Sequence, residues 1–202
     1  GAEGAYESLG RFNHYLANDS AAIHYLGKSL EFDPRNRDAL QALAEASALN
    51  GHIKKAEQIL KHSLSMPLKP EERANIYEWY GALMTFSGQW ASAIENFEKA
   101  RLLFEKTDRK GGICNCLREM FCIYFEINQL SIIRNEIQKS TKSTSVETNK
   151  LNYCTEFSSA NAQLAILDEK FVLAKDLITE IETHFGQEAG IKIQAKIAIA
   201  QH

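Results

Sequence analysis

Four cysteines and six histidines are the residues that could bind a metal ion or act as nucleophiles. The cysteines are Cys114, Cys116, Cys122 and Cys154. A single residue separates Cys114 from Cys116, whereas paired zinc ligands usually have two residues between them, and no second pair follows. We therefore expect no metal site. We interpret the cysteines as buried, reduced thiols of a cytoplasmic protein, with a metal or redox site as the alternative.

Motifs of other enzyme and cofactor sites are also missing from the sequence. The histidines form no His-Glu-x-x-His pair, which metalloproteases place on one helix to bind zinc. Gly111-Gly112 is not followed directly by a Lys-Ser or Lys-Thr pair, so the phosphate-binding loop of nucleotide-binding proteins is absent. No Gly-x-Ser-x-Gly turn presents a serine nucleophile. We predict that the protein is not an enzyme and needs no cofactor.

The composition narrows the class of protein and of partner. With 45% hydrophobic and 24% charged residues, the chain has the composition of a folded domain. A net charge of -3 argues against direct binding of nucleic acid, because such proteins are usually basic. No run of 18 apolar residues predicts a membrane span. Because there are only three prolines, almost the whole chain could be helical.

The stretch from residue 6 to residue 34 has the pattern of two helices joined by a turn. Apolar residues recur at helical spacing before and after residues 18–20, whose short polar side chains favour a turn and a helix start. Pro34 ends the second helix, because proline disfavours the helical conformation of the residue before it. Small residues occur where the two helices must approach closely: Gly10, Ala22 and Ser29.

This pattern recurs along the chain. Ala22, Ala56 and Ala93 follow one another at intervals of about 34 and then about 37 residues, and the turn residues Gly88 and Asn128 are separated by about 40 residues. A period of about 34 residues with this order of small and large side chains resembles the tetratricopeptide repeat family. The resemblance depends on one set of positions in the first copy: Tyr6, Leu9, Gly10, Ala22, Leu26, Ser29 and Pro34.

The resemblance implies an all-α fold, namely a right-handed superhelical α-solenoid of about five helical hairpins plus a C-terminal helix. The repeats of this single domain, residues 1–202, cover approximately residues 4–36, 37–70, 71–107, 108–142 and 146–186, and the terminal helix covers 187–201. In the fourth copy Phe121 and Ile133 replace small residues, which predicts longer helices with bulkier contacts. Polar residues 139–148 predict a loop, and residues 151–167 predict the helix after it.

The same resemblance implies that the first helix of each hairpin lines a concave surface, where a peptide or helix of a partner protein binds. Residues one turn away from the packing face form the candidate partner-binding groove: Glu7, Arg11, His14, Tyr15, Gln41, Glu45, Leu49, Glu78, Trp79, Ala82, Phe86, Arg118, Cys122 and Phe125. Aromatic residues and arginine carry much of the binding energy of protein interfaces, so Trp79 and Phe86 are candidate anchors. Packing between helices is the alternative role of these two side chains.

We therefore expect a protein–protein interaction scaffold with another protein or a peptide as its partner, and no binding to nucleic acid or membrane. The alternative is the sensory or regulatory half of a bacterial transcription or signalling regulator, which would bind a peptide or a small ligand. The lengthening of the repeat along the chain resembles the irregular tetratricopeptide portions of such regulators. A homodimer formed through the terminal helix is a further hypothesis.

Overall fold

The computed structural model describes residues 1–142 and 155–185, and every regular element in these two ranges is an α-helix. The chain divides into two compact units, residues 1–108 and 109–202. The first unit contains α1 (Ala2–Tyr15), α2 (Asp19–Phe32), α3 (Arg37–Leu49), α4 (Ile53–Ser65), α5 (Pro70–Phe86) and α6 (Trp90–Lys106). The second contains α7 (Lys110–Glu126), α8 (Leu130–Lys142), α9 (Thr155–Leu167) and α10 (Phe171–Phe185). The all-α prediction is confirmed.

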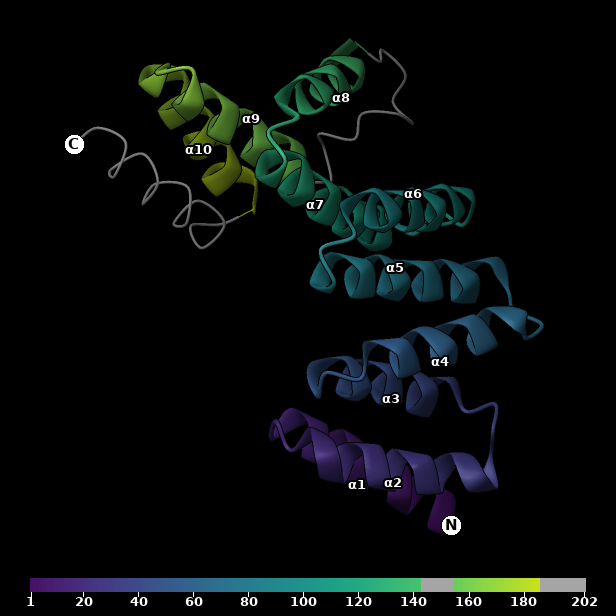
Figure 1. The fold of residues 1–202 in the computed structure, drawn as a ribbon. Helices are drawn as coiled ribbons and strands as arrows, with labels where there is room; N and C mark the ends of the chain where they lie inside the picture. The colour runs from purple at the N-terminus through teal and green to yellow at the C-terminus, as the bar shows by residue number, and fades with distance from the viewer. Residues whose placement is uncertain (143–154, 186–202) are drawn as a thin grey trace. The chain divides into compact units, whose positions relative to one another are not determined.

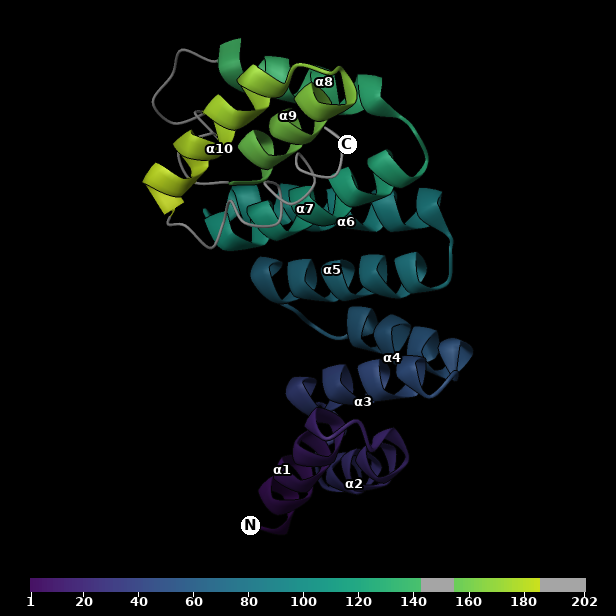
Figure 2. The same ribbon diagram turned by 90° about the vertical axis from the view of Figure 1, so that its left-hand side faces the viewer.

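In the first unit, three helical hairpins stack in chain order, α1 with α2, α3 with α4, and α5 with α6 (Figure 1, Figure 2). The right-handed superhelix and the single-domain organisation stay predictions. The predicted terminal helix, residues 187–201, lies outside the described residues. None of the helices described combines the length and hydropathy that a membrane span requires.

The five hairpins in the described ranges turn in the same way. One residue of each turn has a left-handed backbone conformation. The backbone N–H of the following residue donates a hydrogen bond to a carbonyl of the preceding helix. Examples are Asn18 N–H to the Asn13 carbonyl at 2.9 Å and Lys170 N–H to the Ala165 carbonyl at 2.8 Å. This arrangement satisfies carbonyls that the end of a helix would otherwise leave unbonded. The left-handed residues are Ala17, Gly51, Gly88, Asn128 and Glu169. The sequence predicted the turns at residues 18–20, Gly88 and Asn128, but not that alanine and glutamate would adopt this conformation.

Small residues allow the helices of a hairpin to approach closely, as the sequence predicted. A Cβ atom added to Gly10 would lie 2.5 Å from Leu26 Cγ, and one added to Gly81 would lie 2.8 Å from the Phe97 ring. Ala22 is completely buried and belongs to the cluster in which α2 packs against α3. Glycine at these two positions therefore fixes the distance between the paired helices.

The second unit differs from the first in its contacts and partly from the prediction. Phe121 and Ile133 are both buried where the other hairpins have smaller residues, as predicted. The helices are not longer than those of the third hairpin, because α7 has 17 residues, as α5 and α6 do. The predicted loop over residues 139–148 is wrong in its first part, because α8 continues to Lys142. Ile137 is the last residue of this helix that is buried, and the polar residues 139–142 continue the helix beyond it. Residues 143–148, and 151–154 of the helix predicted after the loop, are outside the described ranges.

Candidate partner-binding groove

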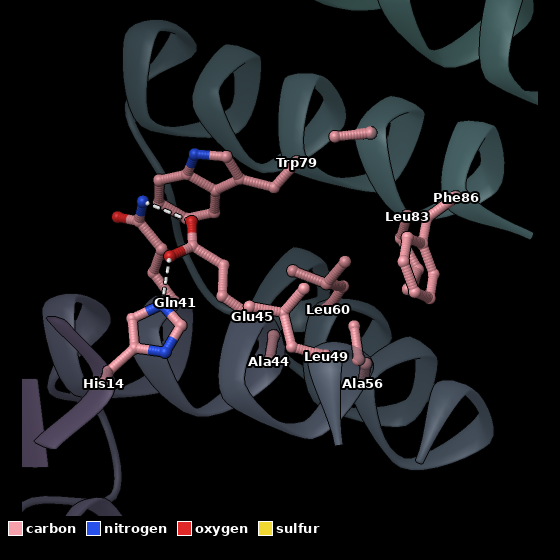
Figure 3. Close-up of a pocket in the computed structure, with 12 residues that line it drawn as sticks. His14, Gln41, Ala44, Glu45, Leu49, Ala56, Leu60, Trp79, Leu83 and Phe86 are labelled. Carbon is pink, nitrogen blue, oxygen red and sulfur yellow. Dashed lines mark hydrogen bonds and ion pairs between the residues drawn. The ribbon is translucent and has the colours of Figure 1, made fainter. Parts of the chain in front are cut away.

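A pocket with a volume of about 280 Å³ opens on the first unit between α3, α4 and α5 (Figure 3). Its lining comes from four helices and is mostly apolar: His14, Gln41, Ala44, Glu45, Ala48, Leu49, Ala56, Leu60, Trp79, Ala82, Leu83 and Phe86. Alanines on three of these helices leave space that larger side chains would fill. The pocket thus follows directly from the small residues of the second and third hairpins.

The regular spacing of helical residues brings the lining together. Gln41, Glu45 and Leu49 are four residues apart on α3, so they share one face of that helix. On α5, Trp79 and Phe86 are seven residues apart and share the face that meets α3 across the pocket. The first helices of two successive hairpins therefore form the two walls.

One end of the pocket is apolar. Leu83 and Phe86 project from α5 toward Leu49 and Leu60 on the opposite side (Figure 3). Leu49 and Phe86 are 58% and 59% exposed, whereas Leu60 is buried in the floor. Two large apolar side chains at the rim therefore remain in contact with water, although an apolar floor lies beside them.

The other end of the pocket is polar and is organised by Glu45. The Gln41 Nε2 donates a hydrogen bond to Glu45 Oε1 at 3.0 Å, and His14 Nε2 lies 3.5 Å from Glu45 Oε2 (Figure 3). The other ring nitrogen of His14 lies 2.9 Å from Asp19 Oδ1. A neutral imidazole can donate to only one of these carboxylates, whereas a protonated one can donate to both. The Glu45 side chain is 43% exposed, so it can accept a further hydrogen bond.

A second hollow continues the pocket toward α1. It is lined by Arg11, His14, Tyr15, Asp38, Gln41, Ala42, Glu45 and Leu49, and we call the two hollows together the first-unit groove. The Arg11 guanidinium lies 3.5 Å from Glu7 and 3.8 Å from Asp38, so acidic side chains on both sides balance its charge. The Glu7 carboxylate also accepts a hydrogen bond of 2.8 Å from the Asn36 amide.

The structure brings together most of the predicted groove residues of the first unit. Nine of them line the groove: Arg11, His14, Tyr15, Gln41, Glu45, Leu49, Trp79, Ala82 and Phe86. Glu7 is beside it through its contact with Arg11, and half-buried Glu78 is not among the lining residues. The remaining three are on α7 in the second unit, where Arg118 and Cys122 are exposed and Phe125 is half-buried. Partner binding by all these residues stays a prediction.

Sequence reasoning missed the floor of the pocket. Ala56 and Leu60 come from α4, and neither is among the residues predicted to line the groove. Their spacing within the repeat identified the packing face correctly, but it gave no sign that part of this face would remain open. The floor could have been predicted from the alanines at positions 44, 48, 56 and 82. Their side chains are too small to fill the space between two hairpins.

The structure corrects the prediction that the cysteines are all buried, reduced thiols. Cys114 is disulfide-bonded, so the prediction of a reduced thiol is wrong for this residue. Cys116 and Cys122 remain thiols, the first buried and the second exposed. Residue spacing could not reveal the disulfide, because pairing depends on which cysteines the fold brings close together. Within the described part of the chain, no cluster of three or more metal-binding side chains occurs.

Comparison with known proteins identifies the fold. No family model and no curated protein matches the sequence. Among solved structures, PilF of Pseudomonas aeruginosa superimposes with a TM-score of 0.65 at 16% identity over 97% of this chain and 90% of that chain. The TPR-like repeats of a putative kinesin light chain from Podospora anserina give 0.64 at 16% identity, over 97% of each chain. A thermophilic TPR protein of Thermus thermophilus gives 0.57 at 16% identity, over 98% of each chain.

Proposed function

We propose that this protein, which has the tetratricopeptide-repeat fold, is a protein–protein interaction scaffold that binds a segment of a partner protein in its first-unit groove. The observation that carries the proposal is the apolar pocket with Leu49 and Phe86 exposed at its rim. Large apolar side chains that stay exposed beside a concave apolar site are typical of binding surfaces.

The two ends of the pocket indicate the chemistry of the segment that would bind. An aliphatic or aromatic side chain of the partner would enter between Leu49 and Phe86 and displace water from the alanine floor. Beside it, a lysine, an arginine or a hydrogen-bond donor would meet the exposed Glu45 carboxylate and the nearby Trp79 ring. The preferred segment therefore combines an apolar anchor with an adjacent donor group.

The proposal is tested with a matched pair of phenylalanine variants. Phe86 and Phe32 are 59% and 57% exposed, but only Phe86 lines the pocket. Binding partners captured from the source cell by the wild-type protein are identified and purified, and their affinity is then measured for Phe86→Ala and Phe32→Ala. We expect Phe86→Ala to weaken binding about tenfold or more, as the truncation of an interface anchor does, and Phe32→Ala to bind as the wild type does.

Circular dichroism of both variants shows whether the helices are retained. Equal affinity of folded Phe86→Ala and wild type for every captured protein would rule out the groove as the binding site. Recovery of a small molecule in place of a protein, lost in Phe86→Ala, would instead favour the sensory half of a regulator.

A further inference from the structure

Carboxylates outnumber permanent cations in the first-unit groove. Glu45 lines both hollows, Asp38 lines the second, and Glu7 lies 3.5 Å from the Arg11 guanidinium. Among the residues that line the two hollows, all in the described part of the chain, only Arg11 has a permanent positive charge. Three carboxylates against one guanidinium leave an excess of two negative charges, which attracts positively charged groups.

The two carboxylates that line the groove are accessible to a further donor. The Asp38 side chain is 70% exposed, and its Oδ2 lies 3.8 Å from the Arg11 guanidinium, which is longer than a direct hydrogen bond. The Glu45 side chain is 43% exposed. A neutral His14 leaves the charge of Glu45 in place, because the closer carboxylate contact of the imidazole, at 2.9 Å, is with Asp19. Both acidic side chains can therefore form an ion pair with a bound segment.

Apolar and acidic side chains follow one another along α3. Asp38, Glu45 and Leu49 are seven and four residues apart and line the second hollow together, so they share one face of the helix. With a rise of about 1.5 Å per residue, Glu45 lies about 6 Å from Leu49 along the helix axis, and Asp38 lies about 16 Å from it. Leu49 and Phe86 form the apolar end of the pocket (Figure 3). A segment that lies along α3 therefore meets an apolar contact first and two acidic contacts beyond it.

An aromatic side chain accompanies each of the two acidic contacts. The Trp79 ring lies near the Glu45 carboxylate in the pocket (Figure 3). Tyr15 lines the second hollow together with Asp38, and it is 86% exposed. The face of an aromatic ring attracts lysine and arginine side chains. A cation at either carboxylate would therefore find an aromatic ring that lines the same hollow, which adds to the attraction of the charge.

We propose that the partner segment in the first-unit groove is basic. One apolar side chain of the segment enters between Leu49 and Phe86, and two lysine or arginine side chains follow it along α3 to Glu45 and Asp38. This inference rests on the proposed function, to which it adds the charge of the segment and the order of its contacts. A segment with acidic residues at the same places would meet two carboxylates of like charge, which weakens binding. The groove thus selects among segments that have the same apolar anchor.

Two pairs of synthetic peptides test the charge of the segment. In one pair, charged residues follow a leucine after four and eleven positions, which is the spacing of a helix that lies along α3. In the other pair they follow after two and five positions, which covers the same distances in an extended chain. The charged residues are lysines in one peptide of each pair and glutamates in the other. Nitrogen–proton correlation spectra of the labelled full chain give the affinities. We expect a lysine peptide to bind about tenfold more tightly than its glutamate counterpart, because two exposed ion pairs replace two repulsions.

Matched carboxylate variants test whether the groove causes this preference. The Asp38 and Glu95 side chains are 70% and 65% exposed, and each lies beside a cation, but only Asp38 lines the groove. Asp38→Asn should reduce the preference for the lysine peptide, and Asp38→Asn combined with Glu45→Gln should abolish it. Glu95→Gln should retain the preference of the wild type. Added salt should also reduce the preference, because it screens exposed charges.

The possible results separate a failure of this inference from a failure of the proposed function. Equal affinities of the lysine and glutamate peptides, or no binding of either lysine peptide, would overturn the basic segment. A captured partner that Phe86→Ala no longer binds would still support the groove as the binding site in that case. A preference that the double variant retains would mean that another acidic surface attracts the peptide, and it would overturn the inference as well. So would a lysine peptide that binds Phe86→Ala as tightly as it binds the wild type.

Discussion

Replacing Gly10 with alanine tests whether the contact between α1 and α2 determines the geometry of the first hairpin. The added Cβ would lie 2.5 and 2.8 Å from two side-chain carbons of Leu26 and 3.1 Å from its backbone nitrogen. Leu26 is completely buried, so it has no open space into which to rotate. The two helices would have to move apart to relieve the overlap.

The magnitude follows from two opposing effects of the substitution. Overpacking a buried contact typically costs about 1–3 kcal/mol, and this contact belongs in the upper half of that range because a backbone atom is also involved. Alanine in a helix interior is more stable than glycine by about 0.5–1 kcal/mol, which offsets part of the cost. We expect Gly10→Ala to lower the free energy of unfolding by about 1–2 kcal/mol.

Gly27 in α2 is the matched control, because a Cβ added there has no neighbouring atom within 4 Å. Gly27→Ala should therefore raise the free energy of unfolding by about 0.5–1 kcal/mol through helix propensity alone. Urea denaturation followed by circular dichroism gives both values. The reasoning is refuted if Gly10→Ala proves as stable as the wild type while Gly27→Ala shows its gain.

Three further substitutions test individual contacts, each by urea denaturation. Ala17→Gly should stabilise the protein by up to about 1 kcal/mol, because glycine relieves the cost of a left-handed backbone, and no gain would contradict that cost. Tyr80→Phe should cost about 1 kcal/mol by removing the hydrogen bond to Glu57, and an unchanged stability would mean that this bond contributes nothing. The two hydrogen bonds from Arg134, supported by Lys170, hold the pKa of Asp168 below its usual range. Their contribution to stability is therefore present above the ordinary carboxyl pKa and is lost as pH falls through the lowered value. Asp168→Asn should be less stable than the wild type at neutral pH, and the difference should shrink on acidification; a constant difference would exclude this linkage.

The fold could be predicted largely from local signals that recur. The spacing of Ala22, Ala56 and Ala93 marks a face where helices must approach, and these alanines are buried as expected. Turn chemistry gave the positions of hairpins, including those at Gly88 and Asn128. These signals act within one hairpin, so they can be recognised without knowledge of the partner helix.

The sequence was less informative where a feature depends on contacts between distant residues. The register of α3 and α5 identified Glu45, Trp79 and Phe86 as neighbours of one groove, but the open floor at Leu60 depends on how two hairpins stack. Leu9 is one of the positions on which the family resemblance depends, yet it is 44% exposed. In the second and third hairpins the preceding hairpin covers this position, as at Leu43, which is 7% exposed. Exposure therefore depends on a neighbouring hairpin, which the sequence of one helix does not show.

The two tryptophans allow the most direct test of partner binding in the first-unit groove. Trp79 lines the pocket, whereas Trp90 lies at the start of α6. A nitrogen–proton correlation spectrum of the labelled protein therefore shows two indole signals, which a Trp90→Phe variant assigns. When a purified partner or its binding segment is added, we predict that the Trp79 signal shifts and the Trp90 signal stays in place. A bound partner that moves the Trp90 signal alone, or neither signal, would contradict binding in the first-unit groove.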